Sequence, residues 1–236
     1  MSDFYLPPCC TALSDHWPLP QALAGVQLIS TRFDPARLGA EDFSRSGIAA
    51  VSGVAKRQTE YLAGRLCARE ALRRVTGMAS VPAVGADRAP QWPAAVSGSI
   101  THGNGWAAAL AAHASAWRGL GLDVEQPLPP ARAERLAAEI LTANEMQQLH
   151  ALAPEQRARR VSLTFSLKES LFKALYPLVL RRFYFHDAEL LDCHDTGNAQ
   201  LRLLIDLHPD WPAGSRLDGQ FVEFDGYLLS LVAIAA

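Results

Sequence analysis

Lysine is scarce in this chain. Lys and Arg together make up 22 of its 236 residues, but the only lysines are Lys56, Lys168 and Lys173. Two of these three fall inside the nine residues 165–173. Because lysine offers a compact point charge that arginine does not, this segment is the first place to look for chemistry.

Long apolar runs are also missing, although 49% of the residues are hydrophobic, which is ample for a core. No run approaches the about 20 residues of a membrane-spanning helix, and the N-terminal residues lack the basic and then apolar pattern of a secretory signal. We therefore expect no membrane association and a cytoplasmic location. The four cysteines form no C-x-x-C pair, so we expect free thiols and no zinc site.

An excess of positive charge is absent, since the formal net charge is −2. This argues against nucleic-acid binding and requires any anion site to be local. The densest basic segment, residues 56–74, is typical of an amphipathic helix. In such a helix Arg57 and Arg65 lie roughly 80° apart and two turns along, so one anion could contact both. The alternative is a solvated arginine face.

Carboxylates cluster in residues 121–125. Leu120, Leu122 and Val124 alternate with the other positions, so an extended strand puts Gly121, Asp123 and Glu125 on its opposite face. Two neighbouring carboxylates repel each other unless a base, water or cation compensates, and such oxygen ligands suit Mg²⁺. The pair on its own could equally be a solvated strand end.

Residues 165–173 read F-S-L-K-E-S-L-F-K and indicate a helix that Pro177 ends soon after Tyr176. Glu169 and Lys173 are four residues apart and share a helical face. They could form an ordinary surface ion pair. In a functional interpretation, Glu169 is a third metal-binding carboxylate or a general base, and Lys173 neutralises a phosphate oxygen.

The combined pattern G-x-D-x-E followed by F-S-x-K-E-S-x-F-K-A resembles the 4′-phosphopantetheinyl transferases of the Sfp class. Residues 56–72, K-R-Q-T-E-Y-L-A-G-R-L-C-A-R-E-A-L, and 88–102, R-A-P-Q-W-P-A-A-V-S-G-S-I-T-H, resemble the branch typified by enterobactin synthase component D. The likeness runs from T-R-F-D-P at Thr31 almost to the C-terminus. It implies Mg²⁺-dependent transfer of phosphopantetheine from coenzyme A to a serine of apo acyl or peptidyl carrier proteins, with release of 3′,5′-adenosine diphosphate. Such enzymes serve fatty-acid, siderophore and nonribosomal-peptide synthesis.

The resemblance also implies roles for residues. The metal would be held by Asp123, Glu125 and Glu169, and the catalytic residues would be Glu169, Lys173 and Asp123. Coenzyme A would contact residues of both motif groups, namely Arg57, Arg65, Arg88, Thr101, His102 and Lys173. Lys168 would assist at the phosphates or face solvent.

The expected fold is α+β. Strands are expected at 94–102 and 105–112, helices at 131–141 and 144–152, and strands at 182–193, 200–207 and 220–234. Thr142 and Glu145 make a T-x-x-E capping box. The resemblance implies two similar α/β halves, residues 1–118 and 119–236, related by a pseudo-twofold axis with the active site between them.

Two other functions use the same residues. A magnesium-dependent nucleotide pyrophosphohydrolase would use water in place of serine, and a noncatalytic module would only bind coenzyme A or a carrier protein. The filled acidic positions disfavour the second. Arginines flank the catalytic helix at 157, 159, 160, 181 and 182 and could meet an acidic carrier protein or be solvated loop charges. We expect a monomer, because a chain with both halves need not dimerise to build its site.

Overall fold

The computed structural model describes residues 5–236 and contains two compact units, each described by itself. The first unit comprises most of the chain up to Arg118, and the second begins at Gly119. Two short segments depart from this division, because Pro18–Ala22 belongs to the second unit and Ala236 to the first. Both units combine strands with helices, which confirms the α+β expectation.

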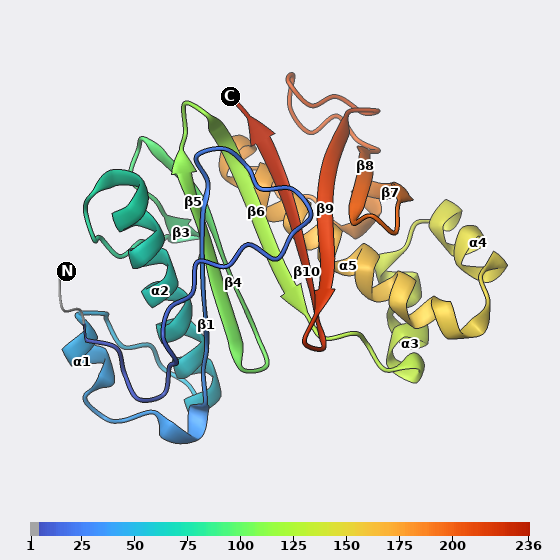
Figure 1. Ribbon diagram of the computed structural model, residues 1–236. Helices are drawn as coiled ribbons and strands as arrows, with labels where there is room; N and C mark the ends of the chain where they lie inside the picture. Colours follow the sequence, from blue (N-terminus) through green and yellow to red (C-terminus); the bar gives the residue numbers. More distant parts are fainter. Residues whose placement is uncertain (1–4) are drawn as a thin grey trace. The chain divides into compact units, whose positions relative to one another are not determined.

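The first unit is a three-stranded antiparallel sheet with one long helix packed on it (Figure 1). The strands are β1 (Gln27–Arg32), β4 (Val96–Gly103) and β5 (Trp106–His113), in the order β1-β5-β4. The helix is α2 (Ala55–Thr76), which contacts all three strands. The smaller elements are η1 (Pro35–Arg37), α1 (Asp42–Ser46) and the two-residue strands β2 (Ala83–Val84) and β3 (Pro90–Gln91).

Small residues let α2 lie close to this sheet. Strand β5 carries alanine at 107, 108, 109, 111 and 112, all fully buried. On the helix, Gly64 lies so close to Ile100 of β4 that a Cβ at this position would come within 2.8 Å of the isoleucine methyl group. The helix ends at Gly77, whose left-handed backbone (φ 78°) is the conformation that glycine accepts at a C-cap.

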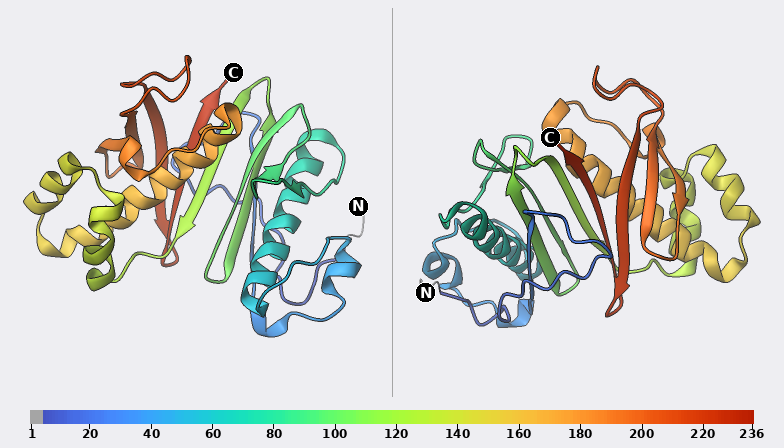
Figure 2. Two further views of the ribbon diagram at one scale, coloured as in Figure 1. Left: turned by 180° about the vertical axis from the view of Figure 1, so that it is seen from behind. Right: turned by 45° about the horizontal axis from the view of Figure 1, so that its top comes forward.

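The second unit is a five-stranded sheet in the order β6-β10-β9-β8-β7. Its strands are β6 (Trp117–Glu125), β7 (Ala188–Cys193), β8 (Asn198–Leu203), β9 (Arg216–Phe224) and β10 (Tyr227–Ala235). Its helices are α3 (Pro130–Ile140), α4 (Ala143–Ala151), α5 (Pro154–Val179) and the short η2 (Phe185–Asp187). Helix α5 packs along β10 and extends across the sheet (Figure 2).

The expected elements are largely present, and the capping box of α4 is confirmed by reciprocal hydrogen bonds between Thr142 and Glu145. Three expectations were wrong. Pro177 does not end α5, which runs on to Val179 and closes at Leu180. Residues 182–187 are not strand, because η2 precedes β7. Residues 220–234 are not one strand. They span parts of β9 and β10, which form a hairpin with its turn at Asp225 and Gly226, where both φ angles are positive.

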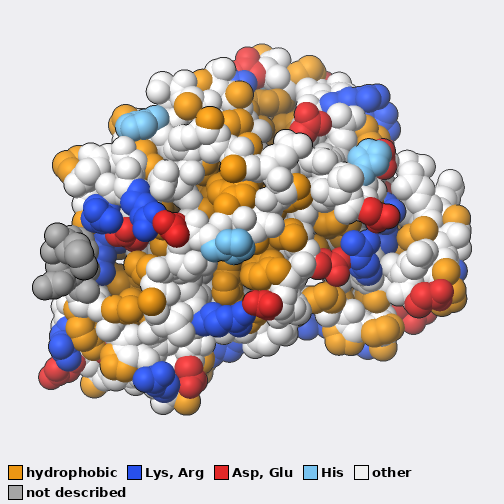
Figure 3. All heavy atoms as spheres, viewed as in Figure 1, with side chains coloured by type: hydrophobic (Ala, Val, Ile, Leu, Met, Phe, Trp, Pro, Cys, Tyr) orange, Lys and Arg blue, Asp and Glu red, His pale blue; other side chains and the backbone are white. Residues whose placement is uncertain are grey.

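The distribution of charged side chains and the state of the cysteines agree with what the composition predicts. Lys and Arg side chains are interspersed with Asp and Glu on the face drawn in Figure 3. All four cysteines are free thiols, as expected. Among the helices of residues 5–236, none has the length and apolar character needed to cross a membrane.

Candidate active site

Helix α5 approaches β6 at two glycines, and this approach organises the acidic residues. A Cβ on Gly119 would lie 2.6 Å from the Ala174 carbonyl oxygen, and a Cβ on Gly121 would overlap the Ser170 carbonyl oxygen. Because side chains alternate along a strand, the next residue on this face is Asp123. The glycine of the G-x-D-x-E pattern is therefore required by helix packing, a role that the motif alone did not suggest.

Asp123 joins the two motifs that lie far apart in the sequence. It is 4% exposed, so the alternative of a solvated strand end is excluded for this residue. The Lys173 ammonium donates to Asp123 Oδ1 at 2.6 Å and to the Leu122 carbonyl oxygen at 3.2 Å. The Ser166 hydroxyl donates to Asp123 Oδ2 at 2.9 Å. Lys173 thus pairs with Asp123 and not, as the surface alternative had it, with Glu169.

Glu125 and Glu169 are the other two carboxylates of the acidic group, and the pKa of each is raised. Burial, together with the charges of Asp123 and Glu169, raises the pKa of Glu125 to about 7 against the opposing effect of Lys173. Burial also raises the pKa of Glu169, while Lys173 lowers it and Asp123 adds to the rise. These acids are close enough to feel one another, which is the crowding that a cation relieves.

The donor set fits Mg²⁺ in chemistry, because three carboxylates supply the hard oxygen ligands that this ion prefers. Within residues 5–236, however, no group of three or more His, Cys, Asp or Glu side chains is arranged as a metal cluster. Lys173 lies on Asp123 Oδ1, where it supplies the compensating positive charge.

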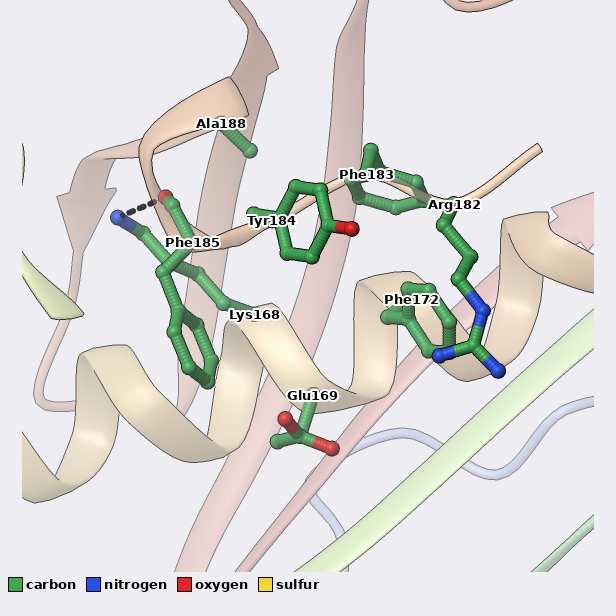
Figure 4. Close-up of a pocket in the computed structure, with 8 residues that line it drawn as sticks. All are labelled: Lys168, Glu169, Phe172, Arg182, Phe183, Tyr184, Phe185 and Ala188. Atoms are coloured by element: carbon green, nitrogen blue, oxygen red, sulfur yellow. Dashed lines mark hydrogen bonds between the residues drawn. The ribbon is translucent and has the colours of Figure 1, made fainter. Parts of the chain in front are cut away.

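Lys168 is not a phosphate ligand and does not face solvent. It is 3% exposed, and its ammonium donates to Glu145 Oε2 at 2.7 Å and to the carbonyl oxygens of Ile140 and Phe185 at 2.9 and 2.8 Å. One helical position is about 100° of rotation, so Lys168 and Glu169 point to different sides of α5 (Figure 4). Lys168 is therefore a structural cation that joins α3, α4 and η2 to α5.

A pocket of about 180 Å³ lies beside Glu169, also shown in Figure 4. Its walls are mainly aromatic and come from α5 and from the segment after it: Lys168, Glu169, Phe172, Arg182, Phe183, Tyr184, Phe185 and Ala188. The bond from Lys168 to the Phe185 carbonyl oxygen fixes the segment that forms the far wall. Sequence reasoning missed this pocket, because it had assigned residues 182–187 to a strand.

The basic residues of the first unit divide into exposed and buried groups. Arg57 is exposed and makes no hydrogen bond or ion pair within residues 5–236. Arg65 is 5% exposed, and its Nη1 has no hydrogen-bond partner in the described part of the chain. The guanidinium lies over the Tyr61 ring at 5.0 Å. The solvated-face alternative therefore fails for Arg65, because its side chain is buried. A buried donor without an acceptor is also costly.

His102 lies next to α2, with Nδ1 3.8 Å from Glu60 Oε2, and Lys56 is 4.0 Å from Glu60 Oε1. Ile100 faces the same helix at Gly64. Strand alternation therefore puts the Thr101 side chain on the opposite face of β4 from His102, and its contact with coenzyme A stays a prediction. Arg88 is exposed in the turn between β2 and β3, with a φ of 72°.

Several arginines beside α5 are already used within the protein. Arg157 donates to the carbonyl oxygens of His150 and Leu152, Arg159 pairs with Glu223, and Arg181 donates to the Asp206 carbonyl oxygen. Arg159 and Arg181 remain exposed to solvent, and contact of these arginines with an acidic carrier protein stays a prediction.

Comparison with known proteins agrees with the motifs. The 4′-phosphopantetheinyl transferase N-terminal domain model matches residues 49–112, and the 4′-phosphopantetheinyl transferase superfamily model matches residues 119–232. A holo-ACP-synthase structure from Plasmodium yoelii shares 14% identity, with a TM-score of 0.37 over 51% of this chain and 95% of that one. This overlap is too distant to bear on the site.

The relatives are nearer in sequence. The 4′-phosphopantetheinyl transferase Svp of Streptomyces mobaraensis is 36% identical over 78% of this chain and 74% of its own length. Enterobactin synthase component D of Salmonella typhimurium is 36% identical over 69% and 67% of the two chains. The 4′-phosphopantetheinyl transferase PptT of Mycobacterium tuberculosis is 32% identical over 70% of each. The chain belongs to the 4′-phosphopantetheinyl transferase superfamily, with relatives of the Svp and enterobactin synthase component D type.

Proposed function

We propose that this protein transfers 4′-phosphopantetheine from coenzyme A to a serine hydroxyl of apo acyl or peptidyl carrier proteins. The observation that carries the proposal is the ion pair between Asp123 and Lys173, 2.6 Å long, which joins the two family motifs. It sets a cation beside three mutually interacting carboxylates, with Glu169 one helical turn away. Pyrophosphate chemistry requires this combination of acidic and basic groups.

Asp123, Glu125 and Glu169 would hold Mg²⁺, which when bound would neutralise charge on the pyrophosphate. Lys173 is half-buried beside these acids and would stabilise negative charge on the phosphate oxygens. Glu169 would serve as a ligand first, and its second oxygen or an oriented water would accept the serine proton. The serine oxygen would then bond to the β-phosphorus as the bond to the bridging oxygen breaks, releasing 3′,5′-adenosine diphosphate.

The first unit would bind the nucleotide end of coenzyme A. Among residues 5–236, Arg65 Nη1 is a buried donor that lacks an acceptor, and Arg57 is an exposed cation on the same helix without an ion-pair partner. Both would be satisfied by a phosphate oxygen. We assign the same end of the molecule to His102, Thr101 and Arg88. The aromatic pocket beside Glu169 would take part of the pantetheine arm, which combines methyl and methylene groups with two amides and a terminal thiol.

The test is the intact mass of an apo acyl carrier protein and an apo peptidyl carrier protein after incubation with this protein, coenzyme A and Mg²⁺. The expected result is a gain of one phosphopantetheine, absent with EDTA and with Asp123→Ala. Coenzyme A cleaved without a gain in carrier mass would indicate the pyrophosphohydrolase. Intact coenzyme A would indicate a binding module. The monomeric state and cytoplasmic location stay predictions.

A further inference from the structure

Three buried serine hydroxyls lie behind Asp123 and form a continuous hydrogen-bonded chain. Ser166 and Ser170 are one turn apart on α5, and Ser230 is on β10. All three are fully buried. Ser230 Oγ is 2.7 Å from Ser166 Oγ and 2.7 Å from Ser170 Oγ, and Ser166 Oγ is 2.9 Å from Asp123 Oδ2. Within residues 5–236, no hydrogen bond joins these serines to Glu125 or Glu169.

The Asp123 carboxylate fixes the direction of the two bonds nearest to it. A carboxylate only accepts, and each hydroxyl has a single proton to donate. Ser166 must therefore donate to Asp123, so the Ser230 hydroxyl is the donor in the bond between Ser166 and Ser230. Ser170 has one proton for two acceptors of the same residue, the Ser230 carbonyl oxygen at 3.0 Å and Ser230 Oγ at 2.7 Å. The protons of Ser166 and Ser230 point toward Asp123.

Buried hydroxyls of α5 have a simpler way to be satisfied. Ser162 and Thr164 donate to the carbonyl oxygens of Ala158 and Arg160, four residues earlier in the helix. Ser166 and Ser170 instead bond across to the neighbouring strands. The helix thus has hydroxyls of both kinds within two turns, and only one kind leads to the acidic site.

We propose that Ser166, Ser230 and Ser170 are positioning residues for Asp123. By occupying Oδ2 with a donor whose own orientation is fixed, the chain holds the carboxylate so that Oδ1 stays on the side of Lys173. Glu125 and Glu169 have no hydrogen bond or ion pair within residues 5–236 and remain free to adjust. Outer partners of this kind orient a ligand and tune its affinity for a metal. This inference rests on the proposed function.

The test measures Mn²⁺ affinity by electron paramagnetic resonance in the presence of coenzyme A, for the full chain and four variants. Ser166→Ala removes the donor to Asp123 and should weaken Mn²⁺ binding about 10-fold or more. Ser230→Ala should have a smaller effect and Ser170→Ala the smallest, following distance along the chain. Thr164→Val is the matched control, because it removes a buried hydroxyl of the same helix that bonds only to backbone.

Stability is measured in parallel by thermal unfolding, so that a loss of fold is separated from a loss of position. Equal Mn²⁺ affinities for Ser166→Ala and Thr164→Val, in a wild-type protein that binds Mn²⁺ and modifies a carrier protein, would overturn the positioning role and leave the proposed function intact. The same follows if all three serine variants lose affinity only in proportion to their unfolding. A wild-type protein that neither binds Mn²⁺ nor modifies a carrier would overturn both.

Discussion

The two long helices differ in whether their polar side chains have partners within the protein. In α5 the buried polar groups have partners within the protein: Lys168 has three acceptors, and the serines bond to one another and to Asp123. In α2 the buried Arg65 has a donor without an acceptor, and the exposed Arg57 has no partner in the part of the chain that the structure describes. The second unit holds a carboxylate in place, whereas the first has buried and exposed donors for which we propose an anion as partner.

The two helices also differ in what limits their approach to the sheet. At Gly121 the backbone of α5 is the neighbour, but at Gly64 of α2 the neighbour is one methyl group of Ile100. Backbone cannot move aside without moving the helix, while a side chain can adjust. The position of α5 on β6 is therefore more rigidly determined than the position of α2 on β4.

The largest effect is expected at Glu169. Glu169→Gln should reduce transfer at least about 10³-fold, since it impairs both metal binding and proton acceptance. Glu155→Gln, at an exposed position in the first turn of the same helix, is the control. Rates of holo carrier protein formation measure both. A near-normal rate for Glu169→Gln would remove Glu169 from the mechanism.

The next effect is on folding. Gly121→Ala should destabilise the protein by about 3 kcal/mol or more, because its Cβ overlaps the backbone of α5. Gly64→Ala should cost far less, since the Ile100 methyl group can shift and alanine is the better helix former by about 1 kcal/mol. Urea unfolding gives both values. Similar losses of unfolding free energy for the two variants would contradict the difference between the α5 and α2 contacts.

The two lysines of α5 should separate stability from activity. Lys168→Met leaves Glu145 buried without its cation and should cost about 3 kcal/mol of unfolding free energy. Lys173→Met removes a half-exposed partner of Asp123, so its cost should be smaller, but transfer should be lost. If Lys168→Met folds with wild-type stability, the buried ion pair is not the joint described above.

A smaller effect is expected from pH in the presence of EDTA. The pKa of Glu125 is raised by burial from 4.5 to about 7 in the folded protein. Its protonated form therefore favours folding, and this contribution is present below about pH 4.5 and is lost as the pH rises through 7. Glu125→Gln should be more stable than wild type at pH 8 and nearly equal at pH 4. Urea midpoints that differ equally at both values would contradict the shift.

Local rules predicted much of this molecule. Alternation around Asp123 put the acids on one face, and the T-x-x-E signature located α4. The buried, structural role of Lys168 could not be predicted, because its three acceptors come from residues 17 to 28 positions away. A signal for the serine chain did exist in the recurrence of serine at 162, 166 and 170, every fourth residue, but only the packed strands show that two of the three reach the site.

The most direct test of the division between the units is the initial rate of holo carrier protein formation as a function of coenzyme A concentration, for wild type, Arg65→Met and Asp123→Asn. The account predicts that Arg65→Met raises KM for coenzyme A about 10-fold or more with little change in kcat. Asp123→Asn should lower kcat, with the smaller change in KM. An Arg65→Met variant with wild-type KM, or an Asp123→Asn variant with wild-type kcat, would contradict it.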